Sequence, residues 1–150
     1  MSTFDLSKPI AVGADHAGFE YKQELIVWLK EKGYTVSDKG TFDKSSVDYP
    51  DYAHPVAEMV EKGEAAFGIL MCGSANGVCM TANKHQGVRA GLSFQSDVAR
   101  LIRQHNDANI ICLPARFVAF VQVTQMVEIF IATAFEGGRH QNRVNKISYS

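Results

Sequence analysis

The sequence is poor in the features that mark secreted, membrane and nucleic-acid-binding proteins. Its three cysteines are an odd number without a C-x-x-C pair, which argues against a disulfide framework or a zinc ribbon and favours a reducing compartment. The first eight residues lack an apolar signal core, and no segment approaches transmembrane length. The formal net charge is −1 without a basic run, so neither nucleic acid nor a membrane is an expected partner. We therefore expect a cytoplasmic protein.

Linkers, internal repeats and low-complexity segments are also missing. The chain has 150 residues, of which 46% are hydrophobic. This size and composition predict one globular domain over residues 1–150, with a core large enough to need no metal or disulfide staple.

The common nucleotide, phosphatase and metal motifs fail on this sequence. Gly13–Gly18 has the glycine spacing of a P-loop opening, but Phe19-Glu20 replaces the Lys-Ser/Thr pair, and the segment does not match G-x-G-x-x-G. A cysteine-dependent phosphatase needs an arginine six residues after Cys72, where Val78 stands. The histidines are scattered without a metal-ligand spacing, so we expect no metal; they are His16, His54, His85, His105 and His140.

Apolar periodicity indicates strands alternating with helices. We predict strands at residues 10–13, 34–36, 67–71, 88–92 and 110–113. We predict five helices. The first runs from Tyr21 to a stop at Gly33, and the second covers 53–62 after a loop over 40–52. The third covers 76–83, the fourth begins after a cap at Ser93 or Ser96, and the fifth covers 119–135. This alternation predicts an α/β fold, a single-domain three-layer α/β/α sandwich with a five-stranded parallel Rossmann-like sheet.

The junction after the third predicted strand carries the strongest functional signal. Cys72 leads there into the loop Gly73–Gly77, so a thiol lies at the rim of the sheet. Backbone N–H groups of this loop and of the following helix favour negative charge, so they stabilise a thiolate and an oxyanion formed beside it. The alternative is that Cys72 is only a small buried apolar residue.

Other polar residues follow the carboxyl ends of the predicted strands, where parallel sheets bind ligands. Asp15-His16 follow the first strand, and Arg116 follows the fifth. His105 continues an apolar stripe from Leu101 at the end of the fourth predicted helix, so we expect it to face inward. Such a histidine alone is more often a packing residue. A thiol, a histidine, an aspartate and an arginine that converge on one rim favour a site.

The tail over residues 136–150 carries Arg139 and Arg143, which share one face if the segment is helical. Guanidinium groups bind phosphate well, although a solvated basic end is the alternative. The predicted helix before the tail is apolar around most of its circumference, at Phe120, Val121, Val123, Met126, Val127, Ile129, Phe130 and Ile131. One sheet face cannot bury all of these, so we expect a twin subunit whose cleft the tail can reach.

The chain resembles the ribose-5-phosphate isomerase type B family, which includes galactose-6-phosphate and allose-6-phosphate isomerases. The likeness covers nearly the whole chain. It rests on the segments Gly13-Ala14-Asp15-His16-Ala17-Gly18-Phe19, Asp38-Lys39-Gly40-Thr41, Asp48-Tyr49-Pro50, Cys72-Gly73-Ser74, Ala82-Asn83-Lys84, Arg103-Gln104-His105-Asn106-Asp107 and Glu136-Gly137-Gly138-Arg139-His140.

The resemblance implies a role for particular residues of this chain. The base that abstracts the sugar proton falls on Cys72, and the ring-opening histidine falls on His105. The implied substrate contacts are Asp15, His16, Gly73, Ser74, Ala75, Asn76, Gly77 and Asn106, and the implied phosphate contacts are Arg116, Arg139 and Arg143. Ala75 departs from the family, because many members have glycine there, so its backbone is less free to adopt positive φ.

The resemblance further implies an aldose–ketose isomerase without a cofactor. Ribose 5-phosphate and ribulose 5-phosphate would interconvert through an enediolate, with the Gly73–Gly77 amides on its oxygen and with Cys72 as a base whose pKa those amides lower. The alternatives are a hexose-6-phosphate isomerase of the same family and a non-catalytic module that binds a phospho-sugar or a nucleotide. We expect a homo-oligomer with shared active sites, either a dimer or a tetramer.

Overall fold

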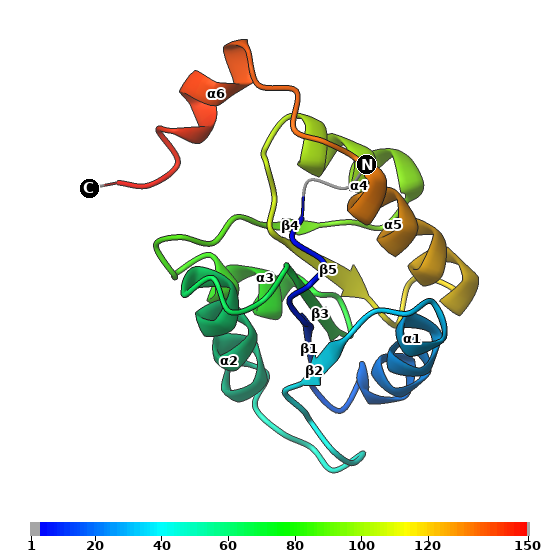
Figure 1. The fold of residues 1–150 in the computed structure, drawn as a ribbon. Coiled ribbons are helices and arrows are strands. Elements are labelled where there is room, and N and C mark those ends of the chain that lie inside the picture. The colour runs from blue at the N-terminus through cyan, green and yellow to red at the C-terminus, as the bar shows by residue number, and fades with distance from the viewer. Residues whose placement is uncertain (1–3, 150) are drawn as a thin grey trace.

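The computed structural model of the chain describes residues 4–149, and these form one parallel sheet flanked by helices (Figure 1). The strands are β1 (Ile10–Ala14), β2 (Val36–Asp38), β3 (Gly68–Cys72), β4 (Ala90–Leu92) and β5 (Ile110–Pro114). The helices are α1 (Phe19–Glu31), α2 (Pro50–Glu61), α3 (Asn76–Ala82), α4 (Ser96–Gln104), α5 (Phe120–Ala132) and α6 (Arg139–Val144). The strand order is β2-β1-β3-β5-β4, and every pairing is parallel.

The sheet separates two apolar cores, because successive strand residues point to opposite faces. Val12, Ile69 and Ile111 face the core that α1, α4 and α5 cover. Leu70 and Cys112 face the core under α2 and α3. The predicted three-layer α/β/α sandwich is therefore confirmed, and Figure 1 shows these two groups of helices on opposite sides of the sheet.

The topology reverses direction between β1 and β3. From β1 the chain crosses through α1 to β2 on one side, and from β3 it crosses through α3 towards β4 on the other side. The connections therefore leave these two neighbouring strands in opposite directions. Ligands of open parallel sheets bind outside the carboxyl ends of the strands at such a reversal.

Several predicted boundaries are wrong. The second strand is Val36–Asp38, two residues later than predicted, because it pairs with β1 from Ile10 onwards. Helix α2 begins at Pro50, inside the predicted loop, with proline in the first turn where a missing N–H costs nothing. Neither predicted serine caps α4. Gln95 is its N-cap, and the Ser93 hydroxyl donates to the Gln95 carbonyl instead.

The expectation that α5 needs a twin subunit to cover it is also wrong for most of the helix. Its buried residues pack against the sheet, α1 and α4. The ring of Phe130 stacks on Phe4 and packs at a tilt against Phe67. Among the large apolar residues of α5 only Val121 is exposed. Within residues 4–149, no helix has the length and apolar character that a membrane crossing requires.

Candidate active site

The Cys72 thiol lies at the carboxyl end of β3, buried beneath the loop that follows. The backbone N–H groups of Val78, Ala75 and Ser74 point at the thiol and act to lower its pKa. Burial has the larger effect, and with the nearby Asp15 carboxylate it raises the pKa of Cys72 above its ordinary value. The loop donors are thus where we predicted them, but the expected net lowering of this pKa is wrong for the single chain.

The loop keeps its shape through one left-handed residue. Ala75 has φ 64° and ψ 0° and is fully buried, so the position at which the resemblance implied glycine has positive φ here. The Ser74 hydroxyl accepts from the Asn76 backbone N–H at 3.3 Å. A Cβ on Gly77 would collide with the ring of Tyr49, so only glycine lets that ring lie against the loop.

Asp15 and His16 follow β1 at the same edge of the sheet. The Asp15 carboxylate accepts from the backbone N–H groups of Ala17 at 2.9 Å and Gly18 at 3.2 Å, which fixes its direction. His16 Nδ1 accepts from the Val47 N–H at 3.2 Å, so the neutral ring carries its hydrogen on Nε2.

Arg116 completes this edge. Its side chain crosses Gly73, where a Cβ would lie 3.2 Å from the arginine Cδ, and its backbone N–H donates to the Gly73 carbonyl at 3.1 Å. A cavity of 420 Å³ opens beside the loop, lined by Ser74, Asn76, Leu92, Phe94, Pro114 and Phe117. The predicted convergence is confirmed for Cys72, the loop, Asp15, His16 and Arg116.

His105 and Asn106 do not join this edge in the same chain. Helix α4 runs back along the sheet, so it ends beside the amino end of β5, while Cys72 pairs with Pro114 at the other end of that strand. Four residue steps of about 3.3 Å separate the two edges by about 13 Å. The predicted inward stripe is also wrong, because Leu101 is exposed and 39% of the His105 side chain is exposed.

His105 instead belongs to a cluster with the tail. Its ring stacks on His140 with centroids 4.3 Å apart and planes 13° apart, and its Nε2 lies 3.4 Å from a Glu136 carboxylate oxygen. Burial, helped by the neighbouring charge of His105, lowers the pKa of His140. A cavity of 300 Å³ lies here, lined by His105, Asn106, His140, Arg143, Val144 and Ile147.

The three side chains His105, Glu136 and His140 also have their ligand atoms within 4.8 Å of one another, close enough to hold a metal ion. The two rings, however, are nearly parallel. Ring nitrogens bind metals in the plane of the imidazole, and parallel planes do not meet at one ion. A metal here would require one ring to turn.

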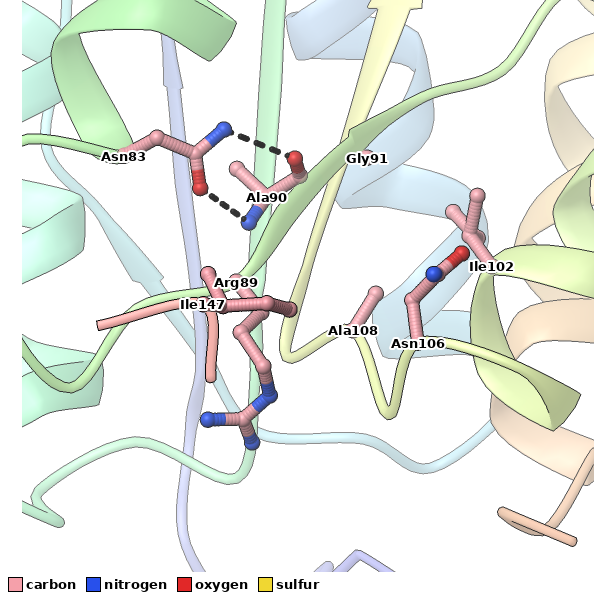
Figure 2. A pocket seen from close by; sticks show the side chains of 8 residues that line it. All are labelled: Asn83, Arg89, Ala90, Gly91, Ile102, Asn106, Ala108 and Ile147. Atoms are coloured by element: carbon pink, nitrogen blue, oxygen red, sulfur yellow. Dashed lines mark hydrogen bonds between the residues drawn. The ribbon is translucent and has the colours of Figure 1, made fainter. Parts of the chain in front are cut away.

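Asn106 also faces a second cavity at the edge strand β4, of 250 Å³ (Figure 2). The Asn83 amide closes the open edge of this strand, because it accepts from the Ala90 N–H at 2.8 Å and donates to the Ala90 carbonyl at 2.9 Å. Asn83 therefore acts as a substitute for a neighbouring strand. Ile147 of the tail covers the same cavity.

The tail arginines lie on α6, so the condition under which they were expected to share a face, a helical segment, is met. Figure 1 shows α6 standing away from the sheet and its flanking helices. Arg143 lines the His105 cavity and Arg139 is exposed, so both arginines accompany His105 rather than Cys72. The structure thus divides the predicted site residues into two groups at opposite edges of the sheet.

Sequence reasoning assigned no role to several residues that shape these two groups. Tyr49 packs on Gly77, and its segment Asp48-Tyr49-Pro50 is one of those that carry the family resemblance, which was the available signal. Arg103 is buried and donates to Asp107 at 3.0 Å and to the Thr133 carbonyl at 3.1 Å, so it ties the turn after His105 to the end of α5. No periodic pattern in the sequence predicts these contacts.

Comparisons with known proteins give a consistent result. The family model described as Ribose/Galactose Isomerase matches residues 10–147. Ribose-5-phosphate isomerase B of Escherichia coli is 43% identical over 141 residues, which is 94% of this chain and 95% of that protein. A ribose 5-phosphate isomerase structure from Thermotoga maritima has a TM-score of 0.92 at 45% identity, over 94% of this chain and 97% of that one. The Mycoplasma genitalium ribose-5-phosphate isomerase B, solved with bound ribulose-5-phosphate, has a TM-score of 0.90 at 42% identity and covers 95% of each chain.

Proposed function

The chain belongs to the ribose/galactose isomerase family, and from this premise we propose that it interconverts ribose 5-phosphate and ribulose 5-phosphate. The pentose is favoured because the Mycoplasma genitalium relative was solved with ribulose-5-phosphate. The reaction moves one proton between adjacent carbons through an enediolate, so it changes no overall oxidation state and needs no redox cofactor. The observation that carries the proposal is the Cys72 thiol under three backbone N–H donors, beside Asp15, where the topology reverses between β1 and β3.

Cys72 acts as the base in this proposal. Its thiolate takes the proton from C2 of the open-chain aldose, and the electron pair moves to the C1 oxygen. The resulting thiol then returns a proton to C1, while the proton of the C2 hydroxyl passes to the C1 oxygen and leaves the C2 carbonyl of the ketose. The amides of residues 73–77 hold the enediolate oxygen. Burial and Asp15 oppose the thiolate in the single chain. The base therefore needs added positive charge when substrate is bound.

A second subunit supplies that charge and the ring-opening histidine. Within one chain, Cys72 and His105 lie at opposite edges of the sheet. A complete site therefore requires four residues of the partner subunit, namely His105, Asn106, Arg139 and Arg143 of the partner subunit. Apolar side chains beside the Cys72 loop support a covering subunit, because Phe94 is 53% exposed and Phe117 is 75% exposed. We infer a dimer in which two sites are crossed in this way.

The substrate phosphate then lies between arginines of both subunits. Arg116 approaches it from the chain that supplies Cys72, and the α6 arginines of the partner subunit approach it from the other side. Guanidinium groups pair bidentately with phosphate, and this remote binding aligns the reacting carbons with the thiol. His105 of the partner subunit transfers a proton at the ring oxygen, while Asp15 binds the sugar hydroxyls.

Purified protein assayed on ribose 5-phosphate, allose 6-phosphate and galactose 6-phosphate tests the proposed activity. We expect turnover on ribose 5-phosphate to exceed that on either hexose. Binding of all three without turnover would instead identify a non-catalytic module. The three free thiols suit a reducing compartment, so we place this reaction in the cytoplasm.

A further inference from the structure

A second pair of histidines belongs to neither group of site residues. His54 on α2 and His85 after α3 are 31 positions apart in sequence, yet His54 Nδ1 and His85 Nε2 face each other at 2.7 Å. The ring planes are inclined by 56°, and the centroids are 5.0 Å apart. These histidines are scattered along the sequence, but the fold brings two of them together.

A carboxylate on the far side of the pair fixes which nitrogen of His85 carries hydrogen. Glu61 Oε1 lies 3.3 Å from His85 Nδ1, and Glu61 Oε2 accepts from the Gly87 N–H at 3.2 Å. An ionised carboxylate only accepts, so His85 Nδ1 holds a hydrogen towards it. The neutral ring then has its lone pair on Nε2, and that lone pair points at His54.

This arrangement matches the outer shell of a metal site. Histidine ligands usually donate their other N–H to a carboxylate, which sets their tautomer and direction. His85 is oriented in this way before any ion arrives, and its side chain is only 14% exposed. His54 is exposed on the surface of α2, so it can shift to admit an ion.

We propose that His54 and His85 are neighbouring ligands of a divalent transition-metal ion of the class that prefers imidazole, such as Ni²⁺ or Cu²⁺. Metal–imidazole bonds of about 2.1 Å at a right angle place the two nitrogens about 3.0 Å apart. The observed 2.7 Å therefore has to widen by only a few tenths of an ångström. A tetrahedral ion needs about 3.4 Å and fits less well.

The ion takes the place of the proton shared by the two rings. His54 Nδ1 loses its hydrogen while Nε2 gains one, so both facing nitrogens offer lone pairs and each ring stays neutral. Glu58, one turn along α2 from His54 and exposed, can add an oxygen ligand, and water fills the remaining positions. The bound ion links α2 to the segment between α3 and β4.

Isothermal titration calorimetry of the whole protein with Ni²⁺ alone tests this site. We expect one ion per chain, at least tenfold weaker binding in His54→Asn, and roughly 10- to 100-fold weaker binding in Glu61→Gln. His140→Asn is the matched control, because it removes an imidazole from the other cluster, and it should bind as the unaltered protein does. His54 is exposed, so the metal-free melting temperature of His54→Asn should be unchanged.

Paramagnetic broadening locates the ion independently of affinity. Amide signals around residues 54 and 85 should broaden first as Ni²⁺ is added, before those around residues 105 and 140. Equal affinity in His54→Asn and the unaltered protein would overturn the proposal. So would loss of binding in His140→Asn, because the ion would then belong to the His105 cluster.

Discussion

Replacing Cys72 by alanine should remove the base while leaving the fold intact. The thiol is 5% exposed, so its loss costs about 1 kcal/mol of packing, close to the value for one buried methylene. Loss of general-base help lowers turnover by roughly 10²- to 10⁴-fold, equivalent to about 2.7–5.4 kcal/mol in the activation barrier. The effect on kcat should therefore far exceed the effect on stability.

The other two thiols provide internal controls for chemical labelling. Cys112 is fully buried and its pKa is raised well above the ordinary range, chiefly by burial. A hydrogen bond from Cys112 lowers the pKa of Cys79, which is only partly buried. At neutral pH iodoacetamide should therefore label Cys79 before Cys72 in the free protein, and Cys112 should resist.

The pH dependence follows from the same shifts. A thiol with a raised pKa is more fully protonated at neutral pH than an ordinary thiol, so the labelling rate of Cys72 should still climb where an ordinary thiol has levelled off. Mass spectrometry of digested protein assigns the label to each cysteine over a series of pH values. Ribulose 5-phosphate should protect Cys72 and leave Cys79 reactive.

Near-normal kcat in Cys72→Ala would refute the assignment of the base. The matched variant Cys79→Ala should retain activity, and a loss as large as that of Cys72→Ala would show that the effect comes from packing under α3. Labelling of Cys72 ahead of Cys79 at neutral pH would contradict the dominance of burial over the three loop N–H donors.

Three further predictions concern the loop and the ring-opening step. Ala75→Gly should change the free energy of unfolding, measured in urea, by less than about 1 kcal/mol. The reason is that relief of about 1 kcal/mol of backbone strain at positive φ offsets about 0.8 kcal/mol lost with the buried methyl group. A destabilisation above about 2 kcal/mol would argue against the left-handed conformation. Gly77→Ala should lower kcat roughly 10- to 100-fold, because the new Cβ pushes the loop away from the Tyr49 ring. Adding Tyr49→Ala should restore part of the lost kcat. If kcat is not restored, the collision with Tyr49 is not the cause of the loss. His105→Asn should slow ribose 5-phosphate turnover more than ribulose 5-phosphate turnover, which needs no ring opening. Initial rates are measured in both directions and corrected for the fraction of open-chain aldose. An equal loss of rate in the two directions would assign His105 another role.

Local sequence patterns were enough to predict the strands and the Cys72 edge. Every predicted strand overlaps the observed one, although the second does so only at Val36. Buried parallel strands are easy to recognise because they are apolar on both faces. Asp15, Arg116 and the Gly73–Gly77 loop follow three such strands directly, so their meeting at one edge follows from parallel pairing. The second strand is only half buried, and its register depends on β1 rather than on its own apolar pattern.

The placement of His105 depends on chain direction rather than on pattern. A helix that connects parallel strands returns to their amino ends, so a residue at the end of α4 lies opposite the edge where Cys72 lies. The apolar stripe through Leu101 suggested a buried face, but Arg103, which is formally charged, takes the interior position at that turn and reaches the Thr133 carbonyl. The net pKa of Cys72 also could not be read from the loop, because it depends on how far the sulfur is buried.

Complementation between two inactive variants tests the crossed active site most directly. Cys72→Ala and His105→Asn subunits are mixed, allowed to exchange, and assayed on ribose 5-phosphate, with native mass spectrometry to confirm mixed dimers. With crossed sites, one cleft of each mixed dimer carries both substitutions and the other carries neither, so about a quarter of the unaltered activity should return at equal mixing. If mixed dimers form and no activity returns, Cys72 and His105 act within one chain, and the account of the shared site is wrong.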